Sequence, residues 1–369
     1  MSFLSCKPSV FVIGKEYEIL INTHKNGICM VKIGEELFYE NTSGVLSSEK
    51  NFTKIRIPQE NLNKEKSYQI IFRETINRKG YFSEFAVPQS TTFAFKPLEK
   101  TENIHIYHIA DVHYRFELAL NTISYFGEEL DLLAVNGDIG EVETEQNYFE
   151  VCKFIGEASG GSIPILFSRG NHDTRGKLAE RFVDYFPNNN KKTFYSFEIG
   201  CLNGVVLDCG EDKPDMHREY GFDKGENLYG GTNIFERFRR EETAFLKSVS
   251  LENTDKITFS MTHICPQMTT FKKGDEFDIE RELYQDWTNE LERIGVKLML
   301  CGHYHKAFVL DSNDERNIIP HKFPVVVGSA CFKNEDLWGA AITLNKNFAL
   351  VEFTNKGHNV VEKHEIVFK

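Results

Sequence analysis

The sequence lacks long apolar runs and clustered cysteines. Nowhere in its 369 residues do 18 apolar residues follow one another, so it predicts no membrane-spanning helix. The eight cysteines are scattered without a CxxC pair, and the segment 1–8 has no apolar stretch typical of a secretory signal. We therefore expect free thiols, a reducing compartment and a cytoplasmic location.

Basic residues are also in the minority. The chain has 43 Lys+Arg against 55 Asp+Glu, which gives a formal net charge of −12. This balance argues against a long nucleic acid or a membrane surface as partner, because both are themselves negative. Hydrophobic residues at 41% and aromatic residues at 13% are typical of a globular protein and exclude a disordered or fibrous chain. The length predicts two domains.

Apolar residues alternate with polar ones in the first hundred residues. The alternating positions are Tyr17, Ile19 and Ile21, then Ile55 and Ile57, then Tyr68, Ile70 and Phe72. This period of two, interrupted at Asn26-Gly27 and Ser43-Gly44, is typical of short half-buried strands. It predicts a small all-β sandwich domain over residues 1–98, without a helix. We expect the second domain to cover residues 103–369.

From residue 104 onward, predicted strands alternate with predicted helices. Strands are expected at 104–110, 132–135 and 163–167, separated by helices at 116–130 and 145–158. This order predicts an α/β fold with a parallel sheet covered by helices. Further strands are expected at 194–199, 205–208, 257–261, 297–301, 325–327, 341–344 and 349–353, and further helices at 234–249 and 277–294.

Polar residues gather where five of these strands end. The segments are Asp111-Val112-His113, Asn136-Gly137-Asp138, Ser168-Arg169-Gly170-Asn171-His172-Asp173, Thr262-His263 and Gly302-His303-Tyr304-His305. Since the carboxyl ends of parallel strands converge on one cleft, we expect these side chains to lie together. Carboxylate and imidazole ligands in one site favour Mn, Fe, Zn or Co over Ca or Mg. The number of ligands indicates two ions rather than one.

The ordered motifs resemble those of the calcineurin-like metallophosphoesterase superfamily. That family shows D-x-H, GD, GNH[DE], a single H and GHxH, which stand here in the same order at 111–113, 137–138, 170–173, 263 and 302–305. The resemblance implies a metallophosphoesterase-type α/β sandwich and a metal-dependent phosphoric ester hydrolase. It implies that Asp111, His113 and His305 hold a first metal ion, that Asn171, His263 and His303 hold a second, and that Asp138 bridges both.

The resemblance also implies a mechanism. A hydroxide that bridges the two metal ions, Mn, Fe or Zn, would attack the phosphorus of a small phosphate ester. His172 would protonate the leaving group as general acid. Asp173 would orient an imidazole by a hydrogen bond.

Several functions remain open on the sequence alone. The enzyme could be a phosphomonoesterase, or a phosphodiesterase that acts on cyclic or small nucleotides. The acidic charge disfavours a nuclease for long polymers. A scaffold that binds metal without catalysis is the alternative outside the enzymes.

A β-sandwich before the catalytic domain is also similar to the layout of purple acid phosphatases. Two positions depart from that subgroup, which has glycine at the place of His113 and a GDxxY motif where this chain has Gly137-Asp138-Ile139-Gly140-Glu141. The tyrosinate that would bind ferric iron is therefore absent from the motif. We expect a colourless metal site.

Two further features have no settled role in the sequence. The polar segment Asp208–Arg240, with His217 and Arg218, is either a lid over the metal cleft or a surface loop. Arg169 and Arg175 flank the GNHD motif. Each either contacts phosphate oxygens or forms a structural ion pair.

Overall fold

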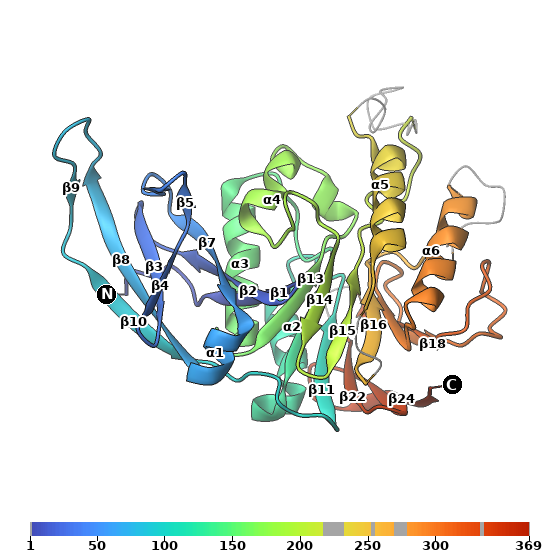
Figure 1. Cartoon of the computed structure of the whole chain (residues 1–369). Coiled ribbons are helices and arrows are strands. Elements are labelled where there is room, and N and C mark those ends of the chain that lie inside the picture. Colours follow the sequence, from blue (N-terminus) through green and yellow to red (C-terminus); the bar gives the residue numbers. More distant parts are fainter. Residues whose placement is uncertain (1, 217–231, 252–254, 269–278, 333–335, 369) are drawn as a thin grey trace.

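Two large β-sheets lie at the centre of the molecule, and a third sheet lies at its N-terminal end (Figure 1). The structure is a computed structural model that describes residues 2–216, 232–251, 255–268, 279–332 and 336–368. The larger central sheet has nine strands in the order β24-β23-β22-β11-β12-β13-β1-β2-β7. The other central sheet has six strands, in the order β14-β15-β16-β17-β19-β18.

The middle of the nine-stranded sheet confirms the predicted alternation of strands and helices. Strands β11 (Ile104–Ile109), β12 (Leu132–Asn136) and β13 (Pro164–Ser168) pair in parallel. Helices α2 (Phe116–Ile123) and α3 (Glu145–Ser159) connect them. The predicted helix 116–130 is shorter than expected, because the chain tightens into the 3₁₀ segment η1 (Ser124–Glu129), which is interrupted at Gly127.

Helix α3 begins and ends as its sequence predicts. The Thr144 hydroxyl accepts the Asn147 N–H at 3.2 Å, and the Asn147 side chain accepts the Thr144 N–H at 2.9 Å, which forms a capping box. The helix ends at Ser159, and the capping residue Gly160 has the left-handed conformation that favours glycine. Its apolar side packs on one face of the nine-stranded sheet, where Tyr148 and Ile155 are fully buried.

The six-stranded sheet carries the second half of the fold. Its strands are β14 (Tyr195–Ile199), β15 (Leu202–Val206), β16 (Ile257–Met261), β17 (Leu298–Cys301), β18 (Phe308–Leu310) and β19 (Val325–Val327). Strands β15, β16, β17 and β19 are parallel neighbours. Helices α5 (Phe235–Ser248) and α6 (Arg281–Arg293) cover its outer face, where Leu246 and Trp287 are fully buried.

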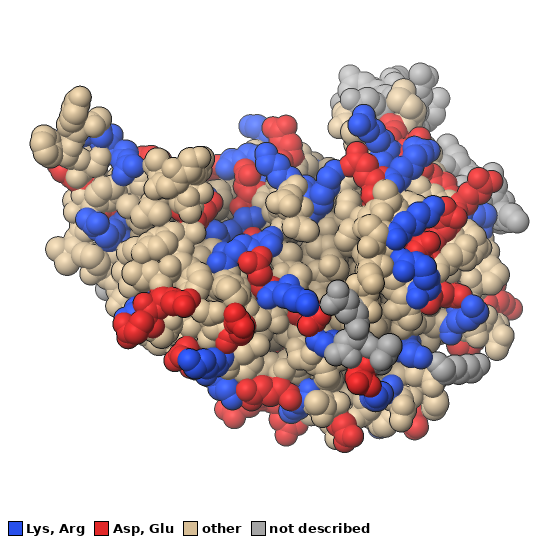
Figure 2. Space-filling view, in the orientation of Figure 1, with Lys and Arg blue, Asp and Glu red and all other residues tan. Residues whose placement is uncertain are grey.

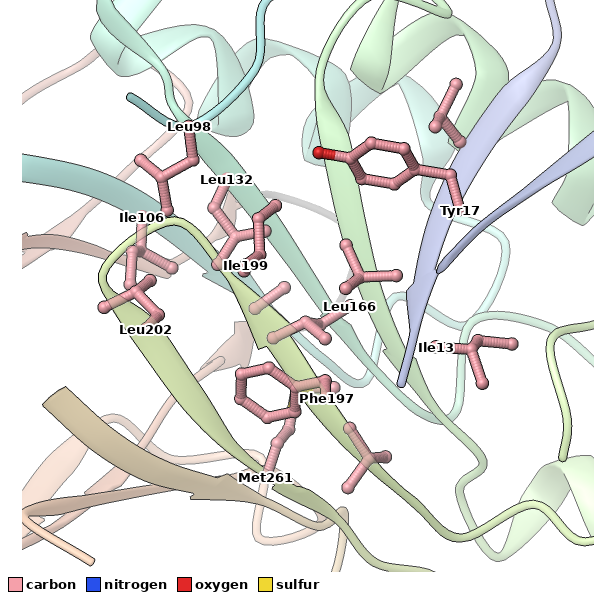
Figure 3. Close-up of a cluster of buried hydrophobic side chains, with 14 of the residues drawn as sticks. Ile13, Tyr17, Leu98, Ile106, Leu132, Leu166, Phe197, Ile199, Leu202 and Met261 are labelled. Carbon is pink, nitrogen blue, oxygen red and sulfur yellow. The ribbon is translucent and has the colours of Figure 1, made fainter. Parts of the chain in front are cut away.

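The two sheets pack face to face through a layer of apolar side chains. Figure 3 shows Ile106, Leu132 and Leu166 of one sheet opposite Leu202 and Met261 of the other, all of them at most 1% exposed. With helices on the outer faces, the architecture is the predicted α/β sandwich.

Three of the N-terminal strands join the nine-stranded sheet. β1 (Ser9–Ile13) pairs in parallel with β13, and β2 (Glu16–Asn22) and β7 (Phe52–Pro58) extend the same nine-stranded sheet. The predicted boundary between residues 98 and 103 stays a prediction. Part of the β-rich region before it is continuous with the catalytic sheet.

Five other N-terminal strands form a sheet that packs against this extension. Its strands are β3 (Gly27–Ile33), β4 (Glu36–Tyr39), β8 (Ser67–Asn77), β9 (Glu84–Phe85) and β10 (Gln89–Ala94). Val31 and Ile70 face Ile19 and Ile55 in one buried cluster, so the two layers do form a sandwich. The expectation of no helix was wrong, since α1 (Gln59–Glu65) lies between β7 and β8.

The C-terminal strands complete the other edge of the nine-stranded sheet. They are the antiparallel strands β22 (Gly339–Leu344), β23 (Phe348–Thr354) and β24 (Val360–Val367). Short elements are β5 (Asn41–Thr42), β6 (Val45–Leu46), η2 (His172–Thr174), η3 (Ala179–Arg181), α4 (Phe182–Tyr185), β20 (Cys331–Phe332) and β21 (Asp336–Leu337). Within the described ranges, every helix is too short or too polar to cross a membrane.

Candidate metal centre

The five polar segments meet where the two central sheets present their strand ends. Three segments follow β11, β12 and β13 of the nine-stranded sheet, and two follow β16 and β17 of the six-stranded sheet. The Asp111 carboxylate joins the two sheets, because its Oδ2 accepts the backbone N–H of His303 at 2.9 Å. The predicted convergence of the five segments is therefore present in the structure.

Asp111, His113 and His305 form the first group of possible metal ligands. One atom of each lies within 4.8 Å of an atom of the other two. His305 Nε2 is 3.1 Å from His113 Nε2 and 3.5 Å from Asp111 Oδ1. These three residues are the set expected for the first metal ion.

Asp138, His263 and His303 form the second group. His263 Nε2 lies 3.2 Å from Asp138 Oδ2. Asn171 joins this group through His303, since its Oδ1 lies 3.0 Å from His303 Nδ1. The second group thus contains the three residues expected for the second metal ion.

Asp138 lies between the two groups. Its Oδ2 is 3.2 Å from His263 Nε2 in the second group and 4.0 Å from His113 Nε2 in the first. Burial by itself would raise the pKa of this carboxyl, but His263 and the neighbouring imidazoles hold it well below its usual range. A carboxylate that stays ionised between two ligand groups suits a bridging role.

The surroundings of the His263 side chain indicate whether the candidate ligands can hold a metal ion. Its Nδ1 donates to the carbonyl of Asn136 at 2.6 Å, which directs Nε2 toward the two aspartates. This buried Nε2 has two carboxylate oxygens as neighbours, Asp138 Oδ2 at 3.2 Å and Asp111 Oδ1 at 3.7 Å. Burial disfavours its protonation, yet Asp138 and Asp111 together raise the pKa of His263 to about 10. The two carboxylates that favour a positively charged imidazole this strongly would also favour a bound metal cation.

Two other ligands are available as neutral imidazoles. Burial is the main cause that lowers the pKa of His113 to about 4 and that of His303 to about 3. Metal ions bind histidine in its neutral form. The mixture of imidazole, carboxylate and amide donors therefore fits transition metal ions.

The backbone at the ligands is strained. Five of the seven candidate ligands have positive φ angles: Asp111 (53°), His113 (44°), Asp138 (54°), His303 (74°) and His305 (51°). Non-glycine residues rarely adopt this left-handed region, and each one costs ~1–3 kcal/mol. Such conformations collect at functional sites.

The motif glycines let the loops approach one another. Gly137 has a φ of +77°, and a Cβ on it would lie 2.5 Å from the backbone nitrogen of Gly170. A Cβ on Gly170 would overlap the Asp138 carboxylate. A larger residue at Gly170 would therefore displace Asp138, and one at Gly137 would push against the Gly170 backbone and the His263 ring.

His172 lies at the mouth of the centre, outside both ligand groups. Its Nε2 is 4.0 Å from Asp138 Oδ2, and its backbone N–H donates to Asp138 Oδ1 at 2.8 Å. About a third of its side chain, 35%, is exposed. The ring is thus open to a molecule that enters the centre.

The contacts of Asp173 differ from the expected contact with an imidazole. Its Oδ2 accepts the backbone N–H of Asp138 at 3.0 Å and that of Gly170 at 2.8 Å. The carboxylate therefore holds two motif loops together. Burial and the charge of Asp138 raise the pKa of Asp173 to about 7.

The structure shows different environments for Arg169 and Arg175, whose roles the sequence left open. Arg169 forms an ion pair with Asp208 at 2.8 Å, lies against Phe182 and Phe238, and is only 12% exposed. It is a structural residue. Arg175 lies beside His172, with Nη1 3.3 Å from His172 Nε2.

Two residues near the ligands lie outside the five family motifs. Asn136 lies beneath the centre, and its amide donates to His108 Nε2 at 3.0 Å and to the Thr262 carbonyl at 3.1 Å. Asp212 Oδ2 lies 3.7 Å from His303 Nε2. Asp212 falls in the segment 208–240, whose closeness to the cleft was one of the expected alternatives. His217 and Arg218 lie outside the described residues.

A family model described as calcineurin-like phosphoesterase matches residues 104–307. No curated protein matches the chain in sequence. The fold is similar to purple acid phosphatase PPD1 from yellow lupin (Lupinus luteus) seeds, with a TM-score of 0.61 and 13% identity over 98% of this chain and 74% of that chain.

The fold is also similar to PhoD, with a TM-score of 0.51 and 11% identity over 100% of this chain and 94% of that chain. At these identities the two structures support the fold alone, including the β-rich region that precedes the α/β sandwich. The family itself follows from the sequence match, which covers more than half of the chain and includes all five motifs. The chain belongs to the calcineurin-like phosphoesterase family and is a metal-dependent phosphoester hydrolase.

Proposed function

We propose that the chain hydrolyses a small phosphate ester at a dinuclear centre of transition metal ions, Mn, Fe or Zn. The observation that carries this proposal is the position of Asp138 between two groups of ligands. When bound, two such ions lower the pKa of a water molecule and offset the charge that develops on the phosphoryl oxygens.

The other roles in the reaction are assigned to individual residues of the chain. Asp111, His113 and His305 would hold the first ion, Asn171, His263 and His303 would hold the second, and Asp138 would be a ligand shared by the two groups. His172 is the candidate general acid. Its partly exposed ring lies at the mouth of the centre, where a leaving oxygen would depart.

The substrate is proposed to be small rather than a long nucleic acid. The net charge of −12 supports this, because an acidic body repels a polyanion. Figure 2 shows basic and acidic side chains interspersed over the described part of the displayed face, without a continuous basic tract there. The same charge disfavours an anionic membrane as partner.

A reducing, cytoplasmic location is proposed as well. All seven cysteines whose side chains are described are free, and six of them are buried. Free buried thiols suit a compartment in which disulfides do not form.

The test is a kinetic screen of the metal-reconstituted protein. An aryl phosphate monoester, an aryl phosphate diester and a cyclic nucleotide would be compared after loading with Mn, Fe or Zn in turn. Turnover that requires metal supports the proposal, and the preferred substrate separates a monoesterase from a diesterase. Full occupancy by two ions without turnover on any of these esters would support the silent scaffold instead.

A further inference from the structure

The loop that follows β15, residues 207–213, places two additional carboxylates beside the metal centre. Glu211 is 1% exposed, and Asp212 Oδ2 lies 3.7 Å from His303 Nε2. Neither residue belongs to the seven candidate ligands. A buried carboxylate next to a cluster of metal ligands needs a partner, because burial without one is costly.

The nearest charged partner of Glu211 is Arg175, from the segment that follows the GNHD motif, and Lys213 Nζ lies farther away, 3.6 Å from Glu211 Oε1. Arg175 Nε donates to Glu211 Oε2 at 2.6 Å, and Arg175 Nη2 donates to Glu211 Oε1 at 2.7 Å. Two parallel hydrogen bonds fix the plane of the guanidinium as well as its position.

The loop that carries Glu211 is itself held rigidly. Arg239 of α5, which is fully buried, donates from Nε to the Cys209 carbonyl at 2.8 Å and from Nη2 to the Glu211 carbonyl. The Gly210 N–H donates to Asp208 Oδ1 at 2.8 Å. Glu211 is therefore presented to Arg175 from a fixed backbone.

This arrangement orients Arg175 toward the centre. Glu211 occupies the edge of the guanidinium formed by Nε and Nη2, and Nη1 lies 3.3 Å from His172 Nε2. Arg175 is 28% exposed and the adjacent His172 is 35% exposed, so solvent reaches both side chains. Arg169, by contrast, is enclosed by aromatic rings and Asp208.

We infer that Arg175 binds the phosphoryl oxygens of the substrate and that Glu211 is the positioning residue that aims its guanidinium. The inference rests on the proposed function and specifies which residue recognises the anionic part of the ester. Glu211 holds Nε and Nη2, and Asp212 Oδ1 also lies 3.7 Å from Nη2, so Nη1 is the part of the guanidinium that faces His172. A phosphoryl group that approaches Asp138 past His172 would come within reach of Nη1.

The test compares the wild-type chain with Arg175→Ala, Arg175→Lys and Glu211→Gln, each loaded with Mn. Titration calorimetry with inorganic phosphate gives Kd, and an aryl phosphate gives KM and kcat separately. Arg175→Ala is expected to raise both Kd and KM by ~10–100-fold, since a hydrogen bond to a charged group is worth about that factor. Arg175→Lys should recover part of the loss, and Glu211→Gln should raise Kd and KM less than Arg175→Ala.

Arg181→Ala is the matched control, because Arg181 pairs with Glu145 at 2.7 Å and neither residue contacts a candidate ligand. It should leave Kd and KM unchanged. The inference is overturned if Arg175→Ala binds phosphate as tightly as the wild type, or if it loses metal, since Arg175 would then act on the centre and not on the substrate. If the wild type binds phosphate but hydrolyses no ester, the proposed function fails while the comparison of Kd values still decides the role of Arg175.

Discussion

The carboxylate of Asp173 fixes the backbone of Asp138, because its Oδ2 accepts the Asp138 N–H at 3.0 Å. The same oxygen accepts the Gly170 N–H at 2.8 Å, and Asp173 is 4% exposed. One buried oxygen thus joins the loop of the central candidate ligand to the loop that carries Asn171 and His172.

Asp173→Ala is expected to weaken metal binding although Asp173 touches no metal ion. It would leave two buried amides without an acceptor, at a cost of ~1–3 kcal/mol each, and would release the Asp138 loop. Loss of a residue that orients a ligand lowers metal affinity by ~10–100-fold. Metal titration of the variant checks this. Asp173→Asn, which keeps one carbonyl oxygen, should lose less, and equal affinity in Asp173→Ala and wild type would contradict the role.

Asp138→Asn should weaken the binding of both metal ions together, because Asp138 lies between the two ligand groups. His113→Ala, in the first group alone, should affect one ion more than the other. Metal content after dialysis against increasing chelator measures both variants. If Asp138→Asn lost a single ion, the bridging assignment would be wrong.

The candidate ligands could be predicted from the sequence because each belongs to a short local pattern. Asp111 and His113 follow one buried strand, and His303 and His305 follow another with the same spacing. A run of apolar residues followed by Asp or His can be recognised locally, without knowing which distant segments it contacts in the fold. The convergence of the strand ends then follows from the topology of parallel sheets.

Contacts between distant loops could not be predicted in this way. β1 pairs with β13, which lies some 150 residues later in the chain, and its uniformly apolar sequence does not specify that partner. The pair of Arg175 and Glu211 depends on a loop that the buried Arg239 holds. We expected Asp173 to contact an imidazole. Its carboxylate instead accepts hydrogen bonds from backbone N–H groups, including that of Gly170.

His172→Ala is expected to keep both metal ions and to slow turnover. The ring lies outside both ligand groups and is partly exposed, so its loss removes a proton donor and no ligand. General acid catalysis is worth ~10²–10⁴-fold, and the loss should be largest for esters with poor leaving groups. A series of aryl and alkyl phosphates measures this dependence. A uniform loss across the series would argue against the acid role.

The metal-loaded protein is expected to be colourless. Gly140 and Glu141 occupy the end of the GD motif where a tyrosine would bind ferric iron. The nearby Tyr114 hydroxyl donates to the carbonyl of Glu141 at 3.0 Å and accepts its N–H at 2.9 Å, so it faces that backbone. A visible spectrum of the iron-loaded protein checks this, and an intense charge-transfer band would contradict it.

His108 should make the stability of the metal-free protein sensitive to acid. It is fully buried, its Nε2 accepts a hydrogen bond from Asn136 at 3.0 Å, and its Nδ1 has no partner within the described residues. Burial, with a smaller contribution from His263, lowers its pKa from 6.5 to about 3. Below about pH 6.5 the unfolded chain binds a proton on His108, whereas His108 of the folded chain stays neutral until the pH approaches 3. The stabilisation is therefore complete above this pH and is lost as the pH falls toward 3.

His108→Gln isolates this effect, because glutamine does not titrate. Between pH 7 and pH 5, the free energy of unfolding of the wild type should fall by about 2 kcal/mol more than that of the variant, which follows from ~1.4 kcal/mol per pH unit below the unfolded pKa. Urea denaturation in chelator at both pH values measures the difference, and the comparison cancels the protonation of all other groups. A fall of equal size in both proteins would mean that His108 takes up its proton in the folded state.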